Sequence, residues 1–241
     1  MNVIITMAGE GRRFQEAGIA TPKPMIEVKG KSLFEWAVGS LKNFYDHPFF
    51  FLSRQSMHAS SFIEEKARAL GISAVSVKEI PGLTRGQAET VLLAEDMVQD
   101  LGDPILIYNI DTFVEPEYLK PEDIRGDGWV PAFRADGDHW SFVRLDEESR
   151  VLEITEKVRI SEYGTIGLYY FSSFNVFKNL YEKHPFELEQ ERYVAPLYRL
   201  MLEDLKLEVY SSLIPKEAVH VLGTPEEVRQ FDPEWNPKTL A

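Results

Sequence analysis

The sequence contains no cysteine and no apolar run long enough to span a bilayer. Without cysteine the chain forms neither disulfide bonds nor thiolate metal sites, which is compatible with the cytoplasm. A membrane-spanning helix needs about 20 consecutive apolar residues. The opening run, residues 2–7, is much shorter and lacks the basic flank of a signal peptide. We therefore expect a cytoplasmic protein without membrane insertion.

Basic residues are in the minority. The chain has 26 Lys and Arg against 39 Asp and Glu, which gives a formal net charge of −13. Such a charge repels nucleic acid and anionic lipid, so neither is an expected partner. An acidic protein that binds phosphate must gather a few basic groups locally. The oligomeric state cannot be read from the sequence.

The front of the chain alternates short apolar runs with segments of helical periodicity. In chain order these are residues 3–5, 33–41, 49–52, 61–70, 75–77, 87–98 and 104–108. Ser61 and Glu64 have capping-box spacing at the start of one helix. The alternation predicts a doubly wound α/β fold with a parallel sheet.

After Asp111 the pattern becomes mixed. We expect strands at 129–134, 141–145, 151–155, 167–171 and 207–211, helices at 173–183 and 194–205, and a last helix capped by Thr224. No linker or repeat interrupts the 241 residues. We interpret residues 1–241 as one domain, with a nucleotide-binding half at 1–111 and a second half at 112–241.

The loop after the first strand has the composition of a phosphate site. Gly9 and Gly11 have no Cβ, so the main chain there can approach an anion closely. Arg12, Arg13 and Lys23 add positive charge.

Two common phosphate motifs do not fit this loop. A dinucleotide-binding G-x-G-x-x-G motif needs glycine at position 14, where the chain has Phe14. A Walker motif ending at Gly30-Lys31-Ser32 needs its first glycine at the position of Met25.

The pattern that fits is G-x-G-x-R, at Gly9–Arg13, followed ten residues later by the lysine of Pro22-Lys23. It resembles the signature of the sugar-1-phosphate nucleotidylyltransferases, or nucleotide-sugar pyrophosphorylases. Their domain has the Rossmann-like GT-A type fold, with a mostly parallel central sheet flanked by helices. Small capsule and lipopolysaccharide biosynthesis members are the most similar. The resemblance implies catalytic roles for Arg13 and Lys23, and nucleotide contacts from Ala8, Gly9, Gly11 and Arg12.

Two later segments have counterparts in this family. The resemblance implies that Gly86 and Gln87 bind the nucleotide. The amide of Gln87 both donates and accepts hydrogen bonds, which favours a pyrimidine base. Asp111 follows a buried strand, and the resemblance implies that it is catalytic and holds Mg²⁺. The plainer alternatives are a helix start for Gln87 and a turn residue for Asp111.

The acceptor side resembles the family at Glu156-Lys157 and at the strand that contains Gly167. By this resemblance Glu156 bonds sugar hydroxyls, Lys157 holds the sugar phosphate, and Gly167 lies beside the sugar. The segments 140–142 and 193–196 are further candidates for this pocket. An exposed acid–base pair is the alternative for residues 156 and 157.

One position departs from the family pattern. Many members have a second metal-binding aspartate where this chain has Val221, and valine cannot bind a metal. His220 is one residue away and, on a strand, points to the opposite face, so we expect it to pack or to lie at the surface. Either Asp111 works with water and phosphate oxygens, or another carboxylate substitutes, or the enzyme is weakened.

The expected reaction joins a nucleoside triphosphate and a sugar phosphate into a nucleotide-sugar with release of pyrophosphate. Two rival functions stay open at this point. A GT-A glycosyltransferase would use a D-x-D motif, of which Asn109-Ile110-Asp111 is half. The other rival is a non-catalytic nucleotide-sugar-binding protein, in which valine could replace the metal-binding aspartate at position 221. The acceptor also stays open between a sugar phosphate and another phosphate, such as that of a polyol or choline.

Overall fold

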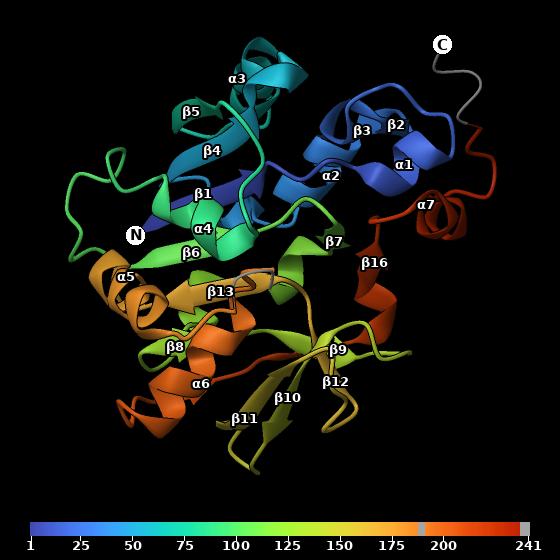
Figure 1. The fold of residues 1–241 in the computed structure, drawn as a ribbon. Coiled ribbons are helices and arrows are strands. Elements are labelled where there is room, and N and C mark those ends of the chain that lie inside the picture. The colour runs from blue at the N-terminus through green and yellow to red at the C-terminus, as the bar shows by residue number, and fades with distance from the viewer. Residues whose placement is uncertain (188–190, 237–241) are drawn as a thin grey trace.

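A seven-stranded sheet forms the centre of the computed structural model, which describes residues 1–187 and 191–236 (Figure 1). Its strands in spatial order are β14 (Val209–Tyr210), β8 (Gly128–Trp129), β13 (Leu168–Phe171), β6 (Ile105–Tyr108), β1 (Asn2–Met7), β4 (Pro48–Arg54) and β5 (Ala74–Ile80). The block from β6 to β5 is parallel, and β13 joins it antiparallel. The predicted α/β fold with a mostly parallel sheet is confirmed.

Helices cover both faces of this sheet because the central strands are apolar on both faces. Every residue of β1 is buried. Val3 and Ile5 pack with α2 (Leu33–Gly39) and α3 (Ser60–Ala69) on one face. Ile4 faces the other side, which is covered by three helices. These are α4 (Gln87–Leu92), α5 (Phe174–Lys183) and α6 (Ala195–Glu203).

A second sheet lies at the lower end of the molecule in Figure 1. Its strands are β11 (Val151–Glu156), β10 (Ser141–Leu145), β12 (Tyr163–Thr165), β9 (Ala132–Arg134) and β15 (Leu213–Ile214). The predicted single strand over 129–134 is wrong, since it divides into β8 and β9, which belong to different sheets. Pro131 lies between them and has no N–H for a ladder bond.

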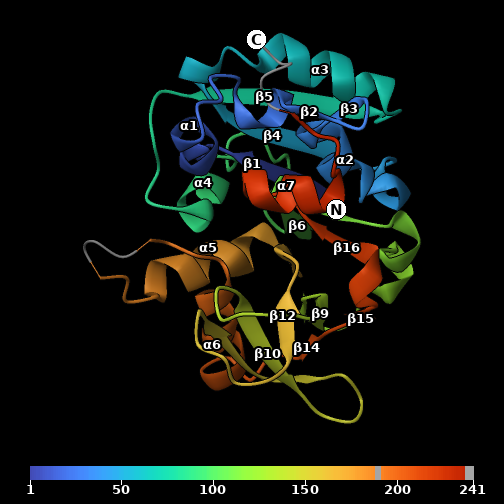
Figure 2. The ribbon, with the colours of Figure 1, turned by 90° about the vertical axis from the view of Figure 1, so that its right-hand side faces the viewer.

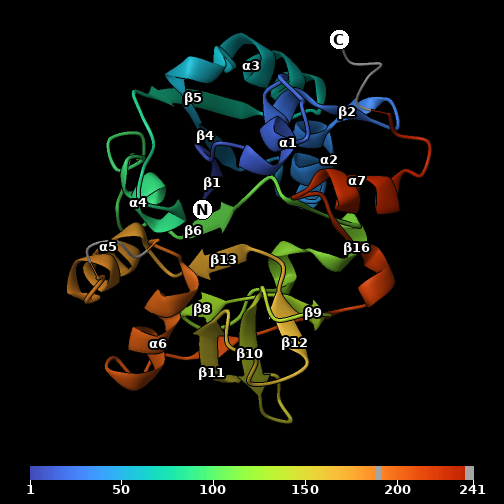
Figure 3. The same cartoon turned by 45° about the vertical axis from the view of Figure 1, so that its right-hand side comes forward.

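The C-terminal part of the chain returns to the N-terminal half. Strand β16 (Val219–Val221) pairs with β7 (Thr112–Val114), and α7 (Pro225–Phe231) follows it. Figures 2 and 3 show α7, in red, beside the blue N-terminal elements. Those elements are α1 (Arg12–Glu16) and the small hairpin β2 (Glu27–Val28)–β3 (Lys31–Ser32). They share a buried core with α7 that includes Phe14 and Val228.

Two predicted details of the helices are wrong. Ser61 does not cap α3, because the helix already begins at Ser60 and its cap position is Ala59. The capping box is instead formed by Ser32 and Glu35 at α2. The helix expected over 87–98 ends at Leu92 and continues as short turns. The predicted Thr224 cap of α7 is confirmed.

None of the helices within the described residues has the length and apolar character that crossing a bilayer requires.

We expect Phe14→Ala to destabilise the protein by about 3–5 kcal/mol, because a buried aromatic side chain leaves a cavity when it is truncated. Phe14 is 1% exposed and joins the opening loop to the α7 core. Urea unfolding monitored by circular dichroism measures the change. Arg12→Ala is the control, since the Arg12 side chain is 73% exposed, and an equal loss in both variants would contradict this account.

Candidate active site

A cavity of about 340 Å³ opens where the carboxyl ends of β1 and β6 meet the second sheet. Most of the predicted site residues line it: Ala8, Gly9, Arg13, Gly86, Gln87, Asp111, Glu156, Lys157 and Gly167. Thus residues separated by up to about 160 positions in the sequence meet at one cavity. Carboxyl ends of parallel strands are the usual ligand edge of open α/β sheets.

Three predicted residues do not line this cavity. Gly11 and Arg12 face an adjoining pocket instead. The guanidinium of Arg12 bonds Glu10 at 2.8 Å, and this hydrogen bond raises its pKa. Lys23 does not line the cavity itself. Its Nζ donates a hydrogen bond to Asp111 Oδ1 at 2.6 Å, and Asp111 lines the cavity.

The opening loop has a backbone shape that favours glycine. Gly11 precedes α1 with φ of +64°, and a Cβ there would contact Cβ of Lys23 at 3.4 Å. Phe14 is buried behind the loop, and Lys23 Nζ lies 5.6 Å from the centre of its ring. The guanidinium of Arg13 has no hydrogen-bond or ion-pair partner among the described residues and lines the cavity. The loop therefore places the unpaired guanidinium of Arg13 at the cavity, whereas the ammonium of Lys23 is paired with Asp111.

Asp111 holds the centre of the site together. Its side chain is 51% exposed, whereas that of Lys23 is only 10% exposed. The backbone N–H of Asp111 donates to Asn109 Oδ1 at 3.2 Å. A Cβ on Gly167 would lie 2.3 Å from Asn109 Nδ2. Asn109 is thus a wall residue that the sequence singled out only as part of an incomplete D-x-D motif.

Gln87 begins α4 and faces the end of β1. Its Nε2 donates to Thr6 Oγ1 at 3.2 Å, so its amide is oriented but retains bonding capacity. Gly86 has φ of +144°, and a Cβ there would lie 2.6 Å from the backbone N and O of Arg192. Residue 86 must therefore be glycine, because any side chain would collide with the backbone of Arg192. Gly86 also lines the cavity.

Glu156 is a largely buried carboxylate on β11. Burial raises its pKa, and the hydrogen bond from Ser141 Oγ opposes that shift in part. Behind it, Tyr169 contacts Ser141 and Thr165 through its hydroxyl, and burial raises the pKa of Tyr169 to about 12. This wall offers a charged acceptor set among neutral hydroxyls, which suits a polyhydroxylated ligand.

Lys157 follows at a left-handed backbone position, with φ of +55°. Its N–H donates to Trp140 O at 2.9 Å. Its Nζ donates to the hydroxyl of Tyr193, which in turn donates to Glu191. The predicted pocket segments 140–142 and 193–196 contribute Trp140, Ser141, Tyr193 and Val194 to the cavity.

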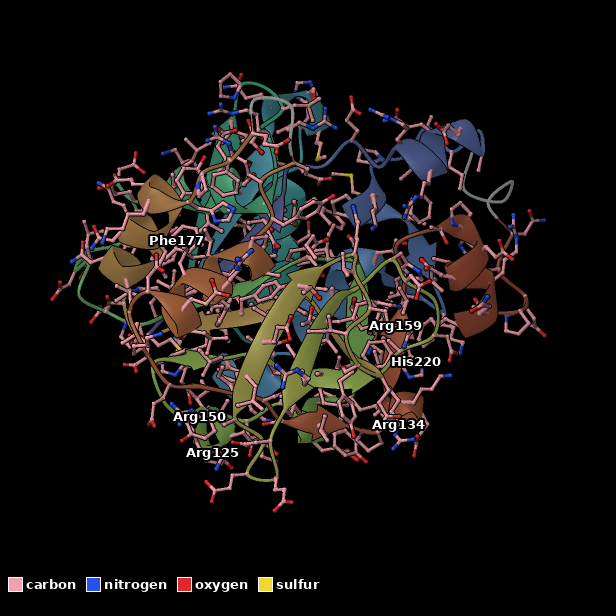
Figure 4. The ribbon with its side chains drawn as sticks, turned by 60° about the horizontal axis from the view of Figure 1, so that its bottom comes forward. Arg125, Arg134, Arg150, Arg159, Phe177 and His220 are labelled. Atoms are coloured by element: carbon pink, nitrogen blue, oxygen red, sulfur yellow. The ribbon has the colours of Figure 1, made fainter. Side chains whose placement is uncertain are left out.

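The region around Val221 contains a residue whose part in the site the sequence did not indicate. Val221 lies opposite Thr112 in the β7–β16 pair, and Leu222 N donates to Asp111 O at 2.6 Å. His220, labelled in Figure 4, lies on β16. Its ring stacks on that of Phe113, with the ring centres 5.5 Å apart, so it packs as predicted. Glu227, in the first turn of α7, also lines the cavity.

The arginines labelled in Figure 4 lie in the half that carries the second sheet, and each has a partner. Arg134, Arg150 and Arg159 pair with Glu162, Glu208 and Asp138, respectively. Arg125 lies over the ring of Tyr210. The unpaired guanidinium of Arg13 differs from all four.

The comparison with solved structures decides the family. A nucleoside-diphosphate-sugar pyrophosphorylase from Vibrio cholerae superposes with a TM-score of 0.88 and 33% identity, covering 97% of this chain and 100% of that one. The chain belongs to the nucleoside-diphosphate-sugar pyrophosphorylases. The predicted nucleotidyltransferase class is thereby confirmed.

Two more distant proteins are similar to this chain, one in structure and one in sequence. An inositol-1-phosphate CTP transferase from T. maritima has 16% identity and a TM-score of 0.77, covering 99% of this chain and 92% of that one. The bifunctional protein GlmU of Methanocaldococcus jannaschii is 24% identical over 86% of this chain. The chain spans about half the length of the curated relatives it matches, 48% in that case. No family model matches the chain.

We expect Gly167→Ala to destabilise the pyrophosphorylase by roughly 1–3 kcal/mol, because a side chain at φ of +79° is strained and would collide with Asn109. Thermal unfolding measures the loss. Gly82→Ala is the control, since a Cβ there meets no atom within 4 Å. Equal melting temperatures for both variants would contradict the packing described.

We expect Glu156→Gln to raise stability at pH 7. A carboxyl whose folded pKa is raised binds its proton more tightly when folded, so stability falls as pH rises through that pKa. The advantage of the variant should vanish below the ordinary glutamate pKa of 4.5. Urea unfolding at pH 4 and pH 7 tests this, with Glu147→Gln, at an exposed position, as control. A pH-independent difference would show that burial of charge is not the cause.

Proposed function

We propose that this chain transfers a nucleotidyl group from a pyrimidine nucleoside triphosphate to a sugar 1-phosphate, yielding a nucleotide-sugar for surface polysaccharide synthesis and pyrophosphate. One observation carries this proposal. Arg13 and Asp111, whose carboxylate is paired with Lys23, line the cavity at the edge of the parallel sheet, and Glu156 and Lys157 line it at the end of β11. Two groups of charged side chains thus face a common space, which suits the meeting of two phosphates.

In the proposed reaction an oxygen of the sugar phosphate attacks the α-phosphorus of the triphosphate. A new P–O bond forms, the bond between the α-phosphorus and the bridging oxygen breaks, and pyrophosphate leaves with the electron pair. The attacking phosphate is already ionised at neutral pH, so no general base is needed. The contribution of the protein is then positioning and charge compensation.

Each charged residue has a part in this scheme. Unscreened phosphate charges about 4 Å apart repel by roughly 4 kcal/mol at an effective dielectric constant near 20. Arg13, which is unpaired, and Lys23 bind the triphosphate, and Lys157 binds the acceptor phosphate. The ionised carboxylate of Glu156 accepts hydrogen bonds from sugar hydroxyls, and Gln87 contacts the base. Residues 1–111 thus bind the nucleotide and residues 112–241 the acceptor, within one domain.

A magnesium ion is the proposed cofactor. The donor set fits it in part, because Mg²⁺ favours one or two carboxylates together with water and phosphate oxygens. Asp111 is half exposed and offers an oxygen that Lys23 does not use. No three Asp, Glu or His side chains come together as a metal cluster within the described residues. When bound, the ion would screen the triphosphate.

We expect Lys23→Ala and Arg13→Ala to lower nucleotidyl transfer by about 10²-fold or more, since each removes charge that compensates the transition state. Arg12→Ala should change it only a few-fold, because that side chain is exposed and paired with Glu10. The measurement is pyrophosphate release from each of four nucleoside triphosphates with a panel of sugar phosphates. Unchanged release in the Lys23 and Arg13 variants would refute the proposal.

A further inference from the structure

Strand β16 contains no carboxylate, so it cannot supply a second magnesium ligand beside Asp111. Val221 occupies the strand position beside it, opposite Thr112. The hydrogen bond from Leu222 N to Asp111 O holds β16 against Asp111. A second ligand must therefore come from another element that reaches the same space.

Glu227 has a backbone role that leaves its carboxylate free. Its N–H donates to Thr224 Oγ1 at 3.2 Å and so completes the cap of α7. At α2, by contrast, the carboxylate of Glu35 accepts from both the N–H and the hydroxyl of Ser32. The carboxylate of Glu227 makes no such return bond: its Oε2 is buried and has no hydrogen-bond partner within the described part of the chain.

The unpartnered oxygen faces the same space as Asp111. A Cβ built on Gly223 would lie 3.2 Å from Glu227 Oε2 and 3.7 Å from Asp111 Oδ2. The other oxygen of Asp111, Oδ1, is the one bonded to Lys23. Two carboxylate oxygens without a cation thus border a space that exists because residue 223 is glycine.

We propose that Glu227 replaces the missing aspartate and binds the divalent cation together with Asp111. This inference rests on the proposed function, because it concerns the cofactor of that reaction. Burying a carboxylate oxygen without a partner is costly, and a divalent cation removes that cost. Magnesium takes oxygen ligands and retains several waters, so two protein carboxylates are sufficient.

The test is the binding of Mn²⁺, used as a paramagnetic probe and measured by electron paramagnetic resonance with and without CTP or UTP. Glu227→Gln keeps the shape of the side chain and removes its charge, and we expect at least a tenfold weaker Mn²⁺ affinity. Glu226→Gln, which removes an exposed charge from the same helix, should bind Mn²⁺ as the wild type does.

Two further variants separate ligation from general charge effects. Gly223→Ala keeps both carboxylates but fills the space between them, so it should also weaken Mn²⁺ binding. Adding Val221→Asp to Glu227→Gln should restore affinity, because it supplies a carboxylate on β16 beside Asp111. Wild-type Mn²⁺ affinity in a folded Glu227→Gln variant would overturn the proposal.

Failure of the Glu227 ligand role and failure of the proposed transferase function give different results. Loss of Mn²⁺ binding in Glu227→Gln, with no pyrophosphate released by the wild type from any triphosphate, would support the metal site and refute the transferase. Pyrophosphate release by the wild type, with unchanged Mn²⁺ affinity in Glu227→Gln, would support the transferase and refute the ligand role of Glu227.

Discussion

The site depends on the ion pair between Lys23 and Asp111. Lys23 comes from the segment after the opening loop, and Asp111 follows β6, so the 2.6 Å contact joins two parts of the chain 88 residues apart. The side chain of Lys23 is only 10% exposed, and its ammonium lies 5.6 Å from the centre of the ring of the buried Phe14. A largely covered side chain with an ionic partner has one favoured position, so this lysine places the loop against the strand end without any ligand.

The second sheet provides the other side of the cavity that Asp111 lines. The parallel block carries the loop and Asp111 at one edge, and the smaller sheet carries Glu156 and Lys157. Strand β13 pairs antiparallel with β6 and continues from the Gly167 turn, which packs on Asn109. The lack of a side chain at Gly167 therefore lets the turn before β13 lie directly against the Asn109 side chain at the cavity.

The parallel half was predictable from the sequence because its strands have short apolar runs that alternate with segments of helical periodicity. The division at Pro131 was not recognised, since residues on both sides of it are apolar and only tertiary pairing assigns them to different sheets. Local motifs were sufficient to mark Gln87, Asp111, Glu156 and Lys157 in the sequence, and all four line the cavity. Asn109 and Glu227 were missed as wall residues because contacts with distant elements place them there.

The contact of Arg192 with Gly86 connects the two sides of the cavity. Arg192 bonds backbone to backbone with Arg85 and Ala88, while the next residue, Tyr193, holds the ammonium of Lys157. Two consecutive residues, Arg192 and Tyr193, thus tie the loop at Gly86 to Lys157. The loop on one side of the cavity and the lysine on the other are therefore not positioned independently of each other.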